Sequence, residues 1–191
     1  MDTKALRAAT QACRSQLSAE TITNASLAIA DRLWHLPLMS RSQRIAAYYS
    51  IGGEVDCQFV IQRAWDRGHK VFLPVLRDEV LMFAPYLPDS EFLRNRHGIP
   101  EPISSNARFF RPGQMDVVLT PLVVFDELGN RLGMGGGYYD RSFRFMHHRN
   151  RWTRPHLVGL AYEFQKVPKL KACSWDVPLH HTVTEKQIYT F

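Results

Sequence analysis

The segment RLGMGGGYYDR, residues 131–141, carries the residue types best suited to binding a charged ligand. A run of glycines lies between the guanidinium of Arg131 and the carboxylate of Asp140, namely Gly133, Gly135, Gly136 and Gly137. Because glycine has no side chain, successive backbone N–H groups can converge on a phosphate. Arginine binds phosphate through a planar fork, and Mg²⁺ prefers carboxylate oxygens as ligands. The segment therefore predicts a site for a nucleotide phosphate and its metal ion.

The common nucleotide-binding motifs do not match this segment. A dinucleotide-binding GxGxxG pattern that starts at Gly133 requires glycine at position 138, where the chain has Tyr138. A P-loop requires Gly-Lys followed by Ser or Thr, and the sequence contains no such triplet. The glycines alone also leave open a purely structural turn, which the preceding DELGNRLG could form.

Length and composition favour one folded domain over residues 1–191. Hydrophobic residues make up 45% of the chain and charged residues 22%, which argues against disorder. The longest apolar stretch, DVVLTPLVVFD, is too short and too interrupted to span a membrane. The cysteines, Cys13, Cys57 and Cys173, form no CxxC pair and are typical of reduced thiols. The first residues lack the apolar core of a secretory signal, so we expect a cytoplasmic protein.

The chain is basic, with a formal net charge of +6. A basic surface attracts polyanions, which include nucleic acids, nucleotides and polycarboxylate metabolites. Much of the excess lies in residues 140–156, which we interpret as a solvated helical face followed by a loop. No helix-turn-helix, zinc-finger or RNA-recognition pattern accompanies it, so we expect small anionic ligands and no nucleic-acid or membrane partner. Nothing in the sequence marks a subunit interface, so we expect a monomer.

Hydrophobic periodicity predicts the elements in the first half of the chain. Lys4, Arg7 and Arg14 fall on one face of a helix predicted over residues 4–17, and apolar residues at helical spacing predict a second over 19–35, capped by Ser18. A strand, a helix and a strand follow, over residues 44–50, 57–68 and 69–76. Such a unit implies two parallel strands joined by a right-handed crossover.

The second half of the chain extends this alternation around the glycine segment. We expect a strand over residues 81–87 and an irregular stretch over 88–114. A strand over 116–125 then precedes the glycines, and a helix over 138–148 and a strand over 156–162 follow them. We therefore predict an α/β fold, a single-domain, open, mostly parallel sheet with helices on both faces in a Rossmann-like three-layer arrangement. Ligands of such sheets bind at the carboxyl ends of the strands, where the glycine segment falls.

An ordered set of segments resembles the 5-formyltetrahydrofolate cyclo-ligase family, also called the 5,10-methenyltetrahydrofolate synthetases. The segments are KALR with the later Arg14, YYSIGGEVD, KVFLP, GIPEP, PLVVFDELGNRLGMGGGYYDR, GLAYEFQ and WDVPLHHTVTE. They cover nearly the whole chain in the family's order, and the glycine block alone is close to diagnostic.

The resemblance implies an ATP-dependent ring closure that uses magnesium. The family converts 5-formyltetrahydrofolate to 5,10-methenyltetrahydrofolate and releases ADP and phosphate. Because a formamide oxygen is a poor leaving group, ATP phosphorylates it, and the 10-nitrogen of the substrate then attacks the activated carbon. Both reacting groups belong to one substrate, so catalysis consists mostly of positioning and charge stabilisation.

The resemblance also implies the residues of the site. Arg131 and Tyr138 are the predicted catalytic residues. The predicted ATP-binding residues are Lys4, Arg7, Arg14, Arg131, Leu132, Gly133, Met134, Gly135, Gly136, Gly137, Tyr138 and Tyr139. The predicted substrate-binding residues are Tyr49, Glu54, Met134, Gly135, Gly136, Gly137 and Tyr138, with Glu54 accepting hydrogen bonds from the N–H groups of the pterin. The predicted magnesium ligands are Asp140 and Asp176.

Two positions depart from the family's pattern. Some members carry lysine where this chain has Gly136, so any role of that lysine would pass to Arg131 or Lys4. His180 and His181 stand where many members have an aspartate. Two other functions stay open at this stage: an ATP-dependent kinase or ligase that acts on another small molecule, and a basic, non-catalytic binder of nucleotide or RNA.

Overall fold

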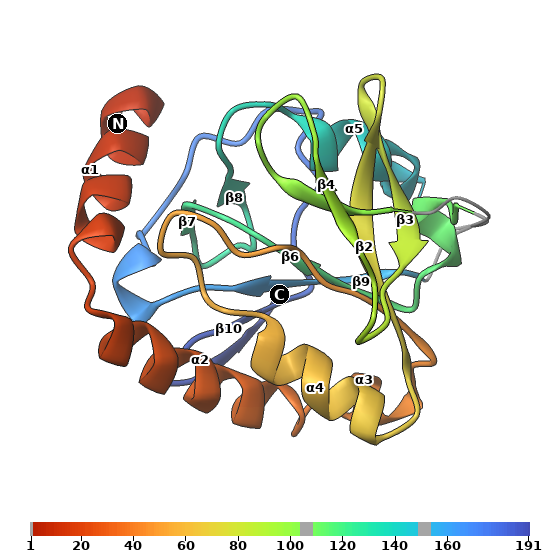
Figure 1. The fold of residues 1–191 in the computed structure, drawn as a ribbon. Coiled ribbons are helices and arrows are strands. Elements are labelled where there is room, and N and C mark those ends of the chain that lie inside the picture. Colours follow the sequence, from red (N-terminus) through yellow and green to blue (C-terminus); the bar gives the residue numbers. More distant parts are fainter. Residues whose placement is uncertain (1, 104–108, 149–153) are drawn as a thin grey trace.

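The computed structural model describes residues 2–103, 109–148 and 154–191. Its centre is a seven-stranded sheet (Figure 1). In spatial order the strands are β11 (Ile188–Thr190), β10 (His181–Val183), β9 (His156–Leu160), β6 (Val117–Thr120), β1 (Arg44–Ala46), β2 (Lys70–Arg77) and β3 (Val80–Pro85). The strands from β10 to β2 run parallel, and β3 and β11 pair antiparallel at the two edges. The predicted open, mostly parallel sheet is confirmed.

Helices cover both faces of this sheet (Figure 1). The helices α2 (Ala19–Leu33), α3 (Pro37–Arg41) and α4 (Gln58–Asp66) pack on one face, and α5 (Tyr138–Phe143) packs on the other. Because successive strand residues point to opposite faces, Ile45 joins the core under α2 and α4 while Ala46 joins the core under α5. The predicted three-layer arrangement is therefore confirmed.

The order of the strands reverses direction between β1 and β6. From β1 the chain crosses through α4 to β2 on one side, and from β6 it crosses through α5 to β9 on the other. The two strands nevertheless pair directly, in parallel. Crossovers that diverge from adjacent strands leave a crevice at the carboxyl ends of those strands, where open α/β sheets bind their ligands. The loops that follow β1 and β6 therefore define the place to look for a site.

Helix α1 (Thr3–Ser15) stands at the side of the molecule, next to the loops of this crevice (Figure 1). A carboxylate oxygen of Asp2 accepts a hydrogen bond from the backbone N–H of Lys4 at 2.9 Å, which caps the helix. Its buried residues are polar ones, Thr10 and Arg14. The helix is thus attached to the body by specific polar contacts as well as by packing.

Several elements differ from the sequence-based expectation. β1 ends at Ala46 instead of residue 50, and the strand expected over 116–125 is interrupted at Pro121, which has no N–H for the sheet. β7 (Val124–Phe125) instead pairs with β8 (Arg131–Leu132) in a separate hairpin. The stretch expected to be irregular holds a second hairpin, of β4 (Phe92–Arg94) and β5 (Pro100–Pro102).

The remaining differences concern shorter elements. The helix expected over 138–148 is α5 followed by a 3-10 turn, η2 (Arg144–His147), and the loop expected at 37–42 holds α3. The strand expected over 81–87 is present as β3, antiparallel to β2. Two further 3-10 turns are η1 (Pro112–Gln114) and η3 (Glu163–Gln165).

Candidate functional site

The glycine loop, residues 133–137, connects β8 to α5 at the crevice. Two of its residues have a positive φ, 102° at Gly135 and 67° at Gly137, a conformation that other residues rarely adopt. Met134, Gly135 and Gly136 are exposed. The loop therefore presents backbone groups to solvent at the carboxyl end of the sheet.

Space around the glycines differs from one position to the next. A Cβ atom at Gly136 would lie 2.8 Å from the ring of Tyr138, and one at Gly137 would lie 2.6 Å from the guanidinium of Arg141. A Cβ atom at Gly133 would meet nothing within 4 Å. The requirement for glycine is thus steric at position 136 and weak at position 133. At position 137 it comes from the positive φ, because the end of the flexible Arg141 side chain can move away.

Arg131 and Asp140 join the two ends of the glycine loop. The guanidinium of Arg131 donates to Oδ1 of Asp140 at 2.8 Å and to the backbone carbonyl of Val177. The same carboxylate oxygen accepts the N–H of Val177 at 3.1 Å. The side chain of Arg131 is 5% exposed and that of Asp140 27% exposed. These bonds hold the loop in one shape, which is a structural task beyond the predicted phosphate contact of Arg131.

The two predicted metal ligands lie on neighbouring segments. Asp176 directly precedes Val177, which binds Asp140, and its own Oδ2 accepts the backbone N–H of Cys173 at 2.7 Å. Within the described ranges, no group of three or more His, Cys, Asp and Glu side chains could hold a metal ion. Magnesium usually binds through one or two carboxylates together with substrate phosphates. The residues present therefore fit a magnesium ion that arrives with a nucleotide.

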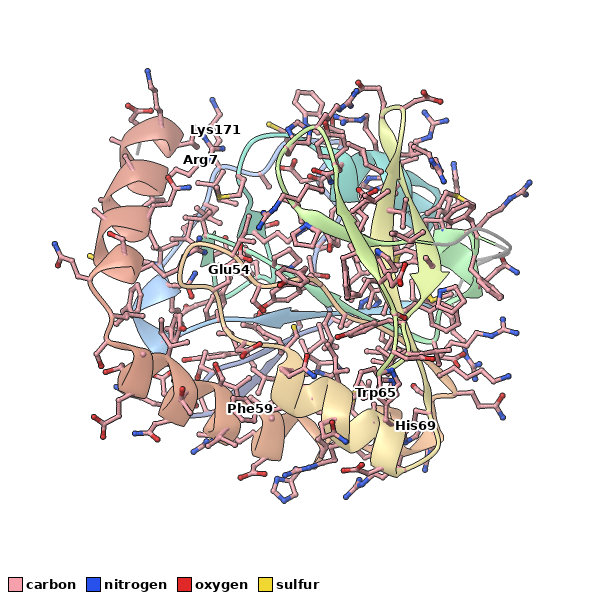
Figure 2. The ribbon with its side chains drawn as sticks, viewed as in Figure 1. Arg7, Glu54, Phe59, Trp65, His69 and Lys171 are labelled. Carbon is pink, nitrogen blue, oxygen red and sulfur yellow. The ribbon has the colours of Figure 1, made fainter. Side chains whose placement is uncertain are left out.

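Helix α1 brings basic side chains to the glycine loop. Nε of Arg7 donates to the carbonyl of Gly133 at 2.7 Å, and the amide of Gln11 contacts the sulfur of Met134 at 3.0 Å. Figure 2 shows Arg7 extending from α1 into the space beside the loops of the crevice. Lys4 is exposed one turn before Arg7, on the same side of the helix.

A cavity of about 500 Å³ lies beside the loop that follows β1. This volume is in the range typical of small-molecule sites. Three aromatic rings on it contact one another edge to face: Phe92 lies 5.8 Å from Tyr49 and 5.5 Å from Tyr86, measured between ring centroids. Its lining residues are Ile22, Tyr48, Tyr49, Ser50, Ile51, Gly52, Gly53, Glu54, Asp56, Cys57, Gln58, Ile61, Leu73, Tyr86 and Phe92.

Glu54 is the buried carboxylate of this cavity, 9% exposed (Figure 2). Its Oε2 accepts the N–H of Ile51 at 3.2 Å, and its Oε1 lies 3.7 Å from NH1 of Arg14. Burial raises the pKa of Glu54 above its ordinary value, while Arg14 and the Ile51 N–H oppose that rise. A carboxylate in such surroundings is well suited to accept hydrogen bonds from a flat heterocycle, because few waters compete there.

Two other titratable groups of the cavity wall, Cys57 and Tyr48, stay neutral. Burial raises the pKa of Cys57 to about 12, so this thiol is not a nucleophile. Burial also raises the pKa of Tyr48 well above its ordinary value. Glu54 and Asp56 are the two carboxyl side chains among the residues that line the cavity.

Tyr138 and Tyr139 have different environments. The hydroxyl of Tyr138 lies 2.9 Å from Nε2 of His97 and 3.2 Å from a guanidinium nitrogen of Arg96, at the turn of the β4–β5 hairpin. Tyr139 stacks on Phe143 at 6.1 Å between ring centroids, and burial raises its pKa. Tyr138 thus faces the β4–β5 hairpin, whereas Tyr139 packs toward the core.

The structure divides the predicted site residues into two groups. Arg7, Arg131, Asp140 and Tyr138 gather around the glycine loop, and Tyr49 and Glu54 share the cavity. Two predicted ATP contacts lie elsewhere: Arg14 is 3% exposed and lies against Glu54, and Tyr139 packs against the core. Sequence reasoning missed Tyr86, Phe92, Arg96 and His97, which carry no motif of their own.

The comparisons with known proteins agree on one family. The model of the 5-formyltetrahydrofolate cyclo-ligase family matches residues 1–185. The chain belongs to this family. It is 39% identical to the 5-formyltetrahydrofolate cyclo-ligase of Escherichia coli K12 over 163 residues, 84% of this chain and 87% of the relative. It is 38% identical to the Haemophilus influenzae enzyme of the same name over 169 residues, 87% of this chain and 88% of that one.

Solved structures of the family have the same fold. The 5,10-methenyltetrahydrofolate synthetase of Aquifex aeolicus superposes with a TM-score of 0.83 and 29% identity, covering 100% of this chain and 93% of that one. The synthetase of Mycoplasma pneumoniae superposes with a TM-score of 0.75 and 27% identity, covering 97% and 99%. None of the helices in the described residues has the length and apolar character needed to cross a membrane.

Proposed function

We propose that the chain closes the ring of 5-formyltetrahydrofolate with ATP, giving 5,10-methenyltetrahydrofolate, ADP and phosphate. The observation that carries the proposal is the position of two features in a member of this family. The cavity with Glu54 follows β1, and the glycine loop lies in the connection from the adjacent strand β6 to α5, after the β7–β8 hairpin. An enzyme that phosphorylates one end of a folate needs its pterin pocket and its phosphate loop side by side.

The pterin of the substrate would bind in the cavity. Glu54 would accept hydrogen bonds from pterin N–H groups, which favour the charged carboxylate. Tyr49, Tyr86 and Phe92 would pack on the flat rings and exclude water. This arrangement fixes the formyl group relative to the glycine loop.

The triphosphate would bind along the glycine loop. Exposed backbone groups of residues 134–136 and the side chains of Arg7 and Lys4 supply donors and positive charge. Asp140 and Asp176 would hold magnesium. A bound magnesium ion would neutralise charge on the phosphoryl group that is transferred. Arg131 would keep the loop in its binding shape through Asp140.

Two bond exchanges then complete the reaction. The formyl oxygen attacks the terminal phosphorus, a P–O bond forms, and the bond to ADP breaks. The 10-nitrogen attacks the formyl carbon and loses its proton, and the C–O bond breaks with release of phosphate. Tyr138, which stands at the edge of the loop with its hydroxyl held by His97 and Arg96, would orient the phosphorylated group.

The test is the formation of the methenyl product, followed by its absorbance, with the purified chain, 5-formyltetrahydrofolate, ATP and magnesium. We expect product only when ATP is present. A folded protein that forms no product contradicts the proposal. If ATP still raises the melting temperature of that protein, the alternative is a kinase or ligase that acts on another small molecule.

We also propose that residues 1–191 act as one domain, as a cytoplasmic monomer that binds no nucleic acid. The sheet that carries the site uses strands from residue 44 to residue 190, so the fold depends on nearly the whole chain. Light scattering of the purified chain tests the oligomeric state, and the mass of a dimer contradicts it.

A further inference from the structure

Arg14 occupies an unusual place for an arginine. Its side chain is 3% exposed. Its Nε donates to the carbonyl of Gly52 at 3.0 Å and its NH1 to the carbonyl of Leu122 at 3.4 Å. These two carbonyls belong to the loops that follow β1 and β6, so one guanidinium bridges both walls of the crevice. Charged side chains are almost never this buried unless they are paired.

The backbone of α1 also presses directly against the loop that carries Glu54. Gly53 has a φ of 74°, and a Cβ atom there would lie 2.8 Å from the carbonyl oxygen of Arg14. The hydroxyl of Tyr162 also donates to the carbonyl of Gly53, at 3.1 Å. The loop therefore has little freedom to move relative to α1.

One face of α1 contacts both parts of the site. Arg7 and Arg14 are seven positions apart, about two helical turns, so their side chains leave the same face. Arg7 binds the glycine loop through the carbonyl of Gly133, and Arg14 binds the cavity loop through the carbonyl of Gly52 and lies 3.7 Å from Glu54.

We propose that Arg14 is a positioning residue that holds Glu54 in its substrate-binding place, and that α1 thereby joins the glycine loop to the substrate cavity. The inference rests on the proposed function, since it takes Glu54 as the group that binds the pterin. It gives Arg14 a task different from the phosphate contact that the sequence resemblance implies. A guanidinium enclosed by two carbonyls and a carboxylate is not exposed to ATP.

The charges around Glu54 make the effect of Arg14 measurable. The groups that act on Glu54 or respond to it are Arg14 from α1, Tyr48 and Cys57 from its own loop, Tyr139 from α5 and Tyr162 after β9. Asp56, from the same loop, also lines the cavity. The tyrosines and the cysteine are neutral because burial raises the pKa of each. Arg14 is the cation among these groups, so its removal favours the protonated form of Glu54.

The experiment compares Arg14→Gln with Arg14→Lys in the full chain. Calorimetric binding of 5-formyltetrahydrofolate without ATP is measured from acid to neutral pH, and KM is measured for both substrates. For Arg14→Gln we expect the pH at which folate binding is half lost to move upward and the KM for folate to rise about tenfold. The KM for ATP should change less than about threefold, because the mutated group does not touch the phosphates. Arg14→Lys should return the pH midpoint toward the wild-type value, because it keeps the charge.

Arg32→Gln is the matched control. Arg32 also donates from α2 to a backbone carbonyl, that of Lys186 at 3.1 Å, and it lies outside the cavity lining. A loss of stability alone would appear in this variant too, whereas a shift of the pH midpoint should not. A double-mutant cycle with Glu54→Gln completes the design: in that background, Arg14→Gln should add no further shift.

Three outcomes would overturn the inference: a pH midpoint that does not move in Arg14→Gln, a KM for ATP that rises as much as the KM for folate, or an Arg14→Gln effect that persists with Glu54→Gln. If Arg14→Gln does not fold, the test is made with Arg14→Lys. Unchanged folate binding together with weakened ATP binding in that variant contradicts the inference. Failure of the proposed function can be distinguished from failure of this inference, since in the first case the wild-type chain itself forms no methenyl product.

Discussion

The glycine loop and the cavity beside β1, the two halves of the candidate site, are built in opposite ways. The loop exposes backbone, and a charge pair between Arg131 and Asp140 maintains its shape. The cavity is lined by aromatic and apolar side chains from several elements, with Glu54 buried at its wall. A phosphate can be bound by one short segment of backbone, whereas a flat ring requires surfaces on several sides. For that reason the first half is visible as a motif and the second is not.

The largest expected effect is that of a substitution at Gly136, which alters the glycine loop and not the cavity. Valine there would collide with the ring of Tyr138, which lies 2.8 Å from the Cβ position, and would displace the exposed backbone groups. We expect Gly136→Val to weaken ATP binding by about a hundredfold or more, since several charge-assisted hydrogen bonds are lost together. The ATP-dependent rise in melting temperature measures the effect. Gly133→Ala should cause a clearly smaller loss, because the space beside Gly133 is open; equal losses would refute the steric explanation.

Glu54→Gln separates the two halves of the site. We expect folate binding to weaken by about ten- to a hundredfold, since hydrogen bonds to a charged group contribute about 1.5–3 kcal/mol. ATP binding should stay unchanged, because Glu54 belongs to the cavity and not to the glycine loop. Calorimetry with each substrate alone measures both affinities. An equal loss of ATP affinity would mean that the two halves do not bind independently.

Asp140→Asn tests whether the charge pair maintains the loop. The pair is only partly exposed, so we expect unfolding to become easier by about 1–3 kcal/mol, below the value for a fully buried pair. Asp31→Asn is the matched control, because Asp31 pairs with Arg63 at 2.6 Å on the surface, where both side chains are well exposed. That variant should lose about 0–1 kcal/mol in urea denaturation. Similar losses in both would show that the loop pair has no special role.

The smallest expected effect is the dependence of stability on pH. Burial raises the pKa of Glu54 in the folded chain above the ordinary value of 4.5, so the folded state holds this proton more tightly than the unfolded state. The contribution of Glu54 to stability therefore falls as pH rises from the ordinary value to the raised one, and is constant above it. Denaturation at several pH values should show this slope in the wild type and not in Glu54→Gln. A slope that persists in the variant assigns it to other groups.

The layered fold and most helices follow from local patterns. Ser18 followed by apolar residues at helical spacing predicts α2, and its hydroxyl indeed accepts the N–H of Thr21 at 3.1 Å. The extent of β1 and the break at Pro121 were harder to predict, because apolar residues fill both the strand and the loop that leaves it. The last two strands, β10 and β11, were not predicted, since three-residue strands have too few positions to show alternation.

In the candidate site, too, the residues of one segment were predictable from the sequence, and contacts between distant segments were not. The spacing of Arg131, the glycines and Asp140 was enough to predict an anion site, because an anion is bound by adjacent backbone groups and a few charges within one segment. Whether Arg14 faced solvent or the interior depended on where the β1 and β6 loops end, which no helical pattern in α1 contains. Contacts between residues distant in the chain decided its burial and its pairing with Glu54. The amino-acid order thus specified the glycine loop by local chemistry, and the packing of separate elements decided the cavity and the burial of Arg14.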